Sequence, residues 1–126
     1  MIVDDHSEMR RTLKNFVKLA SVHKPQIFEF ETGEKALKKY LHHMPDFTLL
    51  DIELQTISGF EVAQEIMKKD SSAKVIMVTS YNTPGFRQKA KRLGAYAFVS
   101  KDNLSELQPL LNNKEINKRV QHEISE

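Results

Sequence analysis

Residues 75–79, with the sequence VIMVT, are the stretch of this 126-residue chain that says most about its fold. Four consecutive apolar residues, rich in β-branched side chains, are typical of a strand that is buried on both faces. Strands of that kind belong to parallel sheets that carry helices on either side. Thr79 then ends the apolar run with a hydroxyl group.

On both sides of this strand, apolar runs alternate with segments whose apolar residues recur at helical spacing. This alternation predicts repeated βα units and a parallel sheet. Ser7 is predicted to cap the first helix, and Pro109 fits the last helix only in its first turn or at a kink. Strands are predicted near residues 2–3, 27–30, 47–50, 75–78 and 96–99, and helices near 7–20, 36–41, 62–67, 84–93 and 104–111.

The composition is that of an ordinary globular protein, with 40% hydrophobic and 29% charged residues and a net charge of +2. The length suits one domain with a single core. No apolar run approaches the roughly 20 residues that a membrane span needs, so no membrane association is expected. The weak net charge does not favour nucleic-acid binding by this chain alone. Cysteine is absent, which excludes disulfides and zinc–thiolate sites and suits a cytoplasmic location.

Four of the five predicted strands run into polar side chains at their carboxyl ends. In an open parallel sheet these ends share one edge, and ligands bind there. The sequence therefore gathers three carboxylates, a hydroxyl and an amine at one place. They belong to Asp4 and Asp5 after the first strand, Asp51 after the third, Thr79 after the fourth, and Lys101 after the fifth.

These residue types together support phosphoryl transfer. Carboxylates about 5 Å apart repel each other by roughly 1–3 kcal/mol per pair, which predicts a bound cation. Oxygen donors without His or Cys favour Mg²⁺. A carboxylate beside Mg²⁺ can attack phosphorus and form an acyl phosphate. The amine of Lys101 and the hydroxyl of Thr79 are suited to meet the charge on the transferred oxygens.

Five blocks of the sequence resemble, in order and spacing, those of response regulator receiver domains of two-component systems. The resemblance covers residues 1 to about 108, and the motif sequences are most similar to those of receivers of LuxR/NarL-type regulators. It implies a flavodoxin-like (βα)5 doubly wound α/β fold with strand order 2-1-3-4-5, the fold of chemotaxis receivers. The blocks are VDDH at residues 3–6, DFTLLDI at 46–52, SGFE at 58–61, VIMVTS at 75–80 and GAYAFVSK at 94–101.

The resemblance also implies a role for each residue of the site. Asp51 is the phosphoacceptor, and it shares Mg²⁺ with Asp4, Asp5 and the backbone carbonyl of Glu53. Thr79 and Lys101 meet the phosphoryl group, and Thr79 and Phe98 form a switch. His6, beside the acids, is expected to be mainly solvated.

The implied function is signalling rather than turnover of a substrate. A sensor histidine kinase supplies the phosphoryl group, and the only expected reactions are phosphorylation and dephosphorylation of the domain itself. The fourth helix, fifth strand and fifth helix then control an output domain or partner, or a homodimer, with transcription regulation as the expected output.

The chain is expected to consist of one domain and a short C-terminal segment, and it departs from the receiver pattern at two places. Residues 1–112 are predicted to be the receiver domain, and residues 113–126, with apolar residues spaced by four, a C-terminal helical extension or linker. Gln55 stands where receivers usually have Pro. Only three residues precede Asp4, fewer than the family normally has, so either the first strand is very short or the sequence lacks its true start.

Two other functions remain open from the residues. A haloacid-dehalogenase-like phosphatase also uses an Asp at a strand end, but it needs a second Asp two residues later, where this chain has Glu53. An interaction module that keeps the fold without being phosphorylated is the other alternative, which the departure at Gln55 leaves open.

Overall fold

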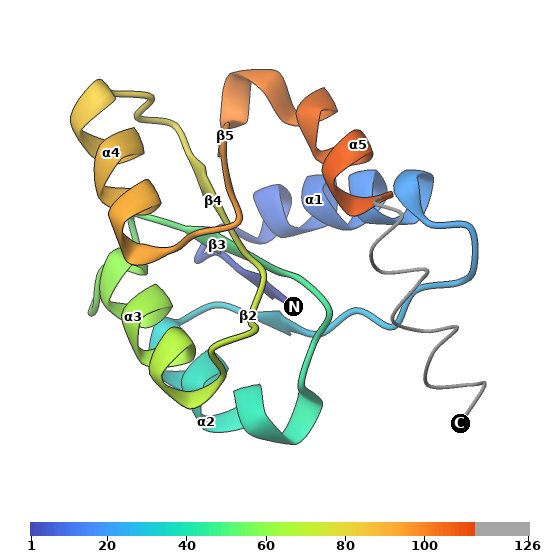
Figure 1. The fold of residues 1–126 in the computed structure, drawn as a ribbon. Helices are drawn as coiled ribbons and strands as arrows, with labels where there is room; N and C mark the ends of the chain where they lie inside the picture. The colour runs from blue at the N-terminus through green and yellow to red at the C-terminus, as the bar shows by residue number, and fades with distance from the viewer. Residues whose placement is uncertain (113–126) are drawn as a thin grey trace.

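A parallel five-stranded sheet forms the centre of the computed structural model, which describes residues 1–112 (Figure 1). The strands lie side by side in the order β2-β1-β3-β4-β5, and every neighbouring pair is parallel. The predicted fold class and strand order are therefore confirmed. The strands are β1 Ile2–Val3, β2 Glu29–Phe30, β3 Thr48–Asp51, β4 Val75–Thr79 and β5 Ala97–Ser100.

Helices cover both faces of the sheet. Figure 1 shows α1 and α5 together on one side, and α2, α3 and α4 on the other. The last connection begins as a 3₁₀-helix, η1, before it becomes α5. The bounds are α1 Ser7–Ala20, α2 Gly33–His43, α3 Gly59–Lys69, α4 Pro84–Leu93, η1 Lys101–Glu106 and α5 Leu107–Leu111.

The core is divided by the sheet into two apolar clusters. Along β4, Val75 and Met77 join the cluster under α2, α3 and α4, whereas Ile76 and Val78 join the cluster under α1 and α5. This is the alternation expected of a strand, whose successive side chains point to opposite faces. All four are at most 1% exposed, so the prediction of a strand buried on both faces is confirmed.

Two local predictions differ from the structure. The second strand was predicted from residue 27 but covers only Glu29–Phe30, because its one neighbour in the sheet, β1, is itself two residues long. The predicted cap Ser7 is instead the first residue of α1; His6 is the N-cap residue and its side chain makes no capping bond. Pro109 lies in the first turn of α5, as predicted.

The predicted C-terminal extension, residues 113–126 with Ile116, Val120 and Ile124, lies outside the described residues. Within residues 1–112, no helix combines the length and the apolar character that crossing a membrane requires.

Candidate functional site

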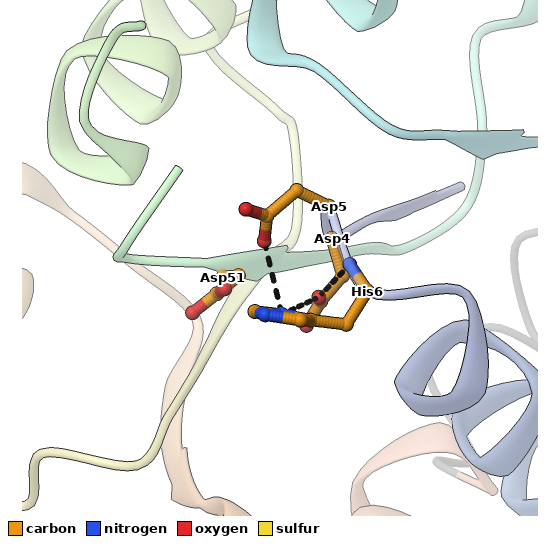
Figure 2. Close-up of side chains that lie close together, drawn as sticks. All are labelled: Asp4, Asp5, His6 and Asp51. Atoms are coloured by element: carbon orange, nitrogen blue, oxygen red, sulfur yellow. Dashed lines mark hydrogen bonds and ion pairs between the residues drawn. The ribbon is translucent and has the colours of Figure 1, made fainter. Parts of the chain in front are cut away.

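Three carboxylates converge at the carboxyl edge of the sheet (Figure 2). Asp4 and Asp5 follow β1, and Asp51 ends β3, which pairs with β1 through Val3 and Leu50. This pairing places the two strand ends next to each other. Asp4, Asp5, Asp51 and His6 each offer a possible ligand atom, and these four atoms all lie within 4.8 Å of one another.

The amine of Lys101 completes this cluster. Lys101 lies at the same carboxyl edge as the acids, at the end of the outer strand β5. Lys101 Nζ lies 3.0 Å from Asp4 Oδ2 and 3.5 Å from Asp51 Oδ2. Lys101 follows β5 directly, and its side chain is only 12% exposed. The predicted meeting of Lys101 with the acids is therefore seen in the structure.

Burial and charge set the protonation of Asp51 and Lys101. Burial raises the pKa of Asp51 from 3.8 to about 6; the positive charge of Lys101 limits this rise, and the negative charge of Asp4 adds to it. Burial alone would lower the pKa of Lys101. Its contact with Asp4 and the charge of Asp51 outweigh burial, and the pKa of Lys101 is raised above its usual value.

Backbone contacts fix the first acid. Asp4 Oδ1 accepts a hydrogen bond of 2.9 Å from the backbone N–H of His6, which orients the carboxylate across the start of α1. Arg10, one turn into that helix, donates from Nη1 to the backbone carbonyl of Asp4 at 2.7 Å. The start of α1 and the end of β1 are thus held together.

The loop after Asp51 is fixed by a close approach of two backbones. Gly59, the first residue of α3, donates to the carbonyl of Ile52 at 2.7 Å. A Cβ atom on Gly59 would lie 2.1 Å from the carbonyl oxygen of Asp51, so only glycine fits. Asp51 Oδ1 also accepts a bond of 3.2 Å from the N–H of Glu53.

Thr79 and Phe98 lie on the same face of the sheet. Phe98 on β5 pairs with Met77 on β4, two residues before Thr79, and it packs against the cluster under α2, α3 and α4. The Thr79 side chain is fully buried, and its hydroxyl oxygen accepts a hydrogen bond of 3.0 Å from the N–H of Tyr81. In this arrangement the hydroxyl is bonded to its own β4–α4 loop.

Some residues near the site were not given roles from the sequence. His6 is 71% exposed, as expected for a solvated side chain, but its Nδ1 lies 3.1 Å from Asp5 Oδ1 and 3.3 Å from Asp4 Oδ1. In the sequence, the position of His6 directly after Asp4 and Asp5 was the feature that could have predicted this contact. No sequence feature predicts the contact of Arg10 with the Asp4 carbonyl, because this contact depends on the direction of α1 relative to β1. The Glu53 side chain is exposed and lies outside the carboxylate cluster.

The donor set fits a hard divalent cation such as Mg²⁺. One lysine faces three carboxylates, so negative charge is left over. Asp5 Oδ1 is buried, and its ion-pair contact with His6 Nδ1 at 3.1 Å is not a well-formed hydrogen bond, so within residues 1–112 this oxygen has no hydrogen-bond donor. Oxygens on opposite sides of Mg²⁺ lie about 4.2 Å apart, close to the observed spread of the ligand atoms.

Known proteins resemble this chain in sequence and fold. The family model for the response regulator receiver domain matches residues 1–112. The chemotaxis protein CheY of Listeria monocytogenes is 40% identical over 101 residues, which cover 80% of this chain and 83% of that protein. The uncharacterized transcriptional regulatory protein YvfU of Bacillus subtilis is 41% identical over 70 residues, which cover 56% of this chain and 35% of that protein.

Among solved structures, a LuxR-family DNA-binding response regulator from Staphylococcus aureus has a TM-score of 0.77 and 31% identity. The alignment covers 89% of this chain and 96% of that one. The receiver-like order of strands, the acid cluster at the carboxyl edge and these matches agree. The chain therefore belongs to the response regulator receiver domains of two-component systems.

Proposed function

We propose that Asp51 accepts a phosphoryl group from a sensor histidine kinase, with Mg²⁺ bound by Asp4, Asp5, Asp51 and the backbone carbonyl of Glu53. The observation that carries this proposal is the position of the Asp51 carboxylate, within the acid cluster and 3.5 Å from the Lys101 amine. The Asp51 carboxylate is thus a buried nucleophile with the positive charge of Lys101 beside it.

Each residue of the site has its own role in the phosphoryl transfer. With a pKa of about 6, Asp51 is mostly ionised at pH 7. Its oxygen forms a bond to phosphorus as the phosphorus–nitrogen bond of the kinase phosphohistidine breaks, and the leaving imidazole is protonated by solvent. The Lys101 ammonium balances charge on the phosphoryl oxygens. Bound Mg²⁺ would supply further positive charge to the same oxygens.

The second half of the proposal is the response. Thr79 turns its hydroxyl toward the phosphoryl group, and Phe98 follows, which changes the face made of α4, β5 and α5. This face then controls an output domain, a partner or a homodimer in the cytoplasm. Transcription regulation is the output favoured by the regulators YvfU and the LuxR-family protein to which the chain is similar.

Labelling of the domain by a small acyl phosphate, followed by intact-mass measurement, tests the first half. With Mg²⁺ present, the wild-type chain should gain one phosphoryl group, and Asp51→Asn should gain none. A chain that takes no label under any condition would be the unphosphorylated interaction module. Many turnovers of p-nitrophenyl phosphate per chain, without stable labelling, would instead support the dehalogenase-like phosphatase.

Hydrogen exchange of the labelled chain tests the second half. Phosphorylation should change exchange most strongly in α4, β5 and α5, because Thr79 and Phe98 connect the site to that face. Changes confined to α1 and α2 would contradict the proposed response.

A further inference from the structure

Arg87, an exposed residue of α4, contacts the switch residue Phe98 and the loop that follows Thr79. Its guanidinium carbon lies 4.8 Å from the centroid of the Phe98 ring, a cation–π distance. Its Nε donates a hydrogen bond of 2.6 Å to Asn82 Oδ1 in the β4–α4 loop. One side chain therefore connects an aromatic ring of β5 to the loop that follows β4.

That loop is the one which holds the Thr79 hydroxyl. Tyr81, the residue before Asn82, donates its N–H to Thr79 Oγ1. At the end of the loop, Thr83 caps α4 by accepting from the N–H of Phe86, so the helix end is fixed. The short segment from Ser80 to Asn82 thus lies between two anchored points, Thr79 and the start of α4.

We propose that Arg87 is a positioning residue: it holds Phe98 and the β4–α4 loop in the arrangement of the unphosphorylated domain. This inference rests on the proposed phosphorylation of Asp51. If the Thr79 hydroxyl turns to a phosphoryl oxygen, the Tyr81 N–H loses its acceptor and the loop moves with Asn82. Arg87 then cannot keep both its bond to Asn82 and its present place over Phe98, so the release of the loop also releases the ring.

The chemistry of arginine suits this task. Its planar guanidinium stacks on an aromatic face while Nε donates in the same plane, which a lysine ammonium cannot reproduce. Lys89, on the same helix, instead lies over Phe60, 4.7 Å from the ring centroid. The contacts of Arg87 are partly exposed, so their loss should shift the balance of the two arrangements by about 3- to 10-fold.

The test compares Arg87→Ala with Arg87→Lys and with Arg92→Ala, which removes the same charge from an exposed position of α4. The first readout needs no phosphoryl group: exchange of the Tyr81 amide hydrogen, measured by NMR in the free chain. The second is the affinity for beryllium fluoride with Mg²⁺, a mimic of the phosphoryl group, followed in the same spectra.

Arg87→Ala should speed exchange of the Tyr81 amide and tighten binding of beryllium fluoride, each by about 3- to 10-fold. Arg87→Lys should fall between Arg87→Ala and wild type, and Arg92→Ala should stay within about twofold of wild type. If Arg87→Ala matches Arg92→Ala in both readouts, or binds the probe more weakly, the positioning role is overturned.

A failure of the proposed function gives a different pattern. If no variant, including wild type, binds beryllium fluoride, phosphorylation at Asp51 is contradicted and the coupling through Arg87 is overturned with it. Accelerated Tyr81 exchange in Arg87→Ala alone would then show a contact that holds the loop without serving a phosphoryl switch.

Discussion

Lys101 Nζ lies 3.5 Å from Asp51 Oδ2, so the positive charge that follows β5 stands next to the carboxylate that ends β3. The same amine is 3.0 Å from Asp4 Oδ2. Lys101 therefore reduces the repulsion between two buried acids and keeps Asp51 ionised near neutral pH.

Replacing Lys101 with Met should raise the pKa of Asp51 above its wild-type value of about 6, because burial and Asp4 would then act without an opposing charge. The pKa is measured from the carboxyl carbon shift of Asp51 during a pH titration in EDTA. Lys89→Met, an exposed substitution on α4, is the control. An unchanged Asp51 pKa in Lys101→Met would show that the two groups do not interact.

Asp51 should also make the metal-free domain less stable as pH rises. Its folded pKa, about 6, lies above the ordinary value of 3.8, so ionisation is harder in the folded state. The stability associated with this group is highest below about pH 4 and falls until about pH 6. Asp51→Asn should therefore raise the free energy of unfolding at pH 7 by on the order of 1–2 kcal/mol after solvent screening, but not at pH 4.

Urea unfolding in EDTA at the two pH values measures this effect, with the exposed Asp102→Asn as control. Equal stabilisation by Asp51→Asn at pH 4 and pH 7 would mean that the gain does not come from removing an ionised carboxylate.

Mg²⁺ should stabilise the wild-type domain, because it binds the folded acid cluster and not the unfolded chain. Above the dissociation constant, each tenfold increase in Mg²⁺ should add about 1.4 kcal/mol to the free energy of unfolding. Asp5→Asn should lose most of this gain. Glu53→Gln should keep it, since only the backbone carbonyl of Glu53 is proposed as a ligand.

Thermal or urea unfolding at a series of Mg²⁺ concentrations gives the comparison. The ligand assignment fails if Glu53→Gln loses the Mg²⁺ effect as fully as Asp5→Asn does.

Gly59→Ala should displace the loop after Asp51, because its Cβ would lie 2.1 Å from the Asp51 carbonyl oxygen. We expect a loss of about 1–3 kcal/mol in stability and slower labelling by an acyl phosphate. Gly85→Ala is the matched control: no atom lies within 4 Å of its new Cβ, and Gly85 stands in the first turn of α4. It should be neutral or gain up to about 1 kcal/mol. Equal stability and equal labelling rates in the two variants would show that the close approach at Gly59 does not position the loop after Asp51.

The sequence was sufficient to predict a parallel sheet with an acid cluster at its carboxyl edge, because both depend on strong local patterns; the strand order was implied only by the resemblance to receiver domains. The apolar run at residues 75–78 is typical of a strand that helices cover on both faces, and a polar side chain directly after a parallel strand lies at the carboxyl edge. Asp51 and Lys101 meet for that reason, although they are fifty residues apart in the numbering.

Other features depend on tertiary context that no local pattern carries. The length of β2 is limited by its neighbour β1 rather than by its own apolar residues. The expected cap at Ser7 was wrong since α1 begins at that residue itself, next to the Asp4 carboxylate that binds the His6 N–H. The place of Arg87 over Phe98 depends on how α4 packs against β5, which the spacing of α4 does not reveal.

Chemical trapping of the phosphorylated residue is the decisive measurement. Borohydride reduces an aspartyl phosphate to homoserine, so peptide mapping after labelling with an acyl phosphate and Mg²⁺ identifies the acceptor. Homoserine at position 51, absent when EDTA replaces Mg²⁺, is the expected result. Homoserine at position 4 or 5, or phosphate that survives borohydride on another side chain, would contradict Asp51 as the acceptor.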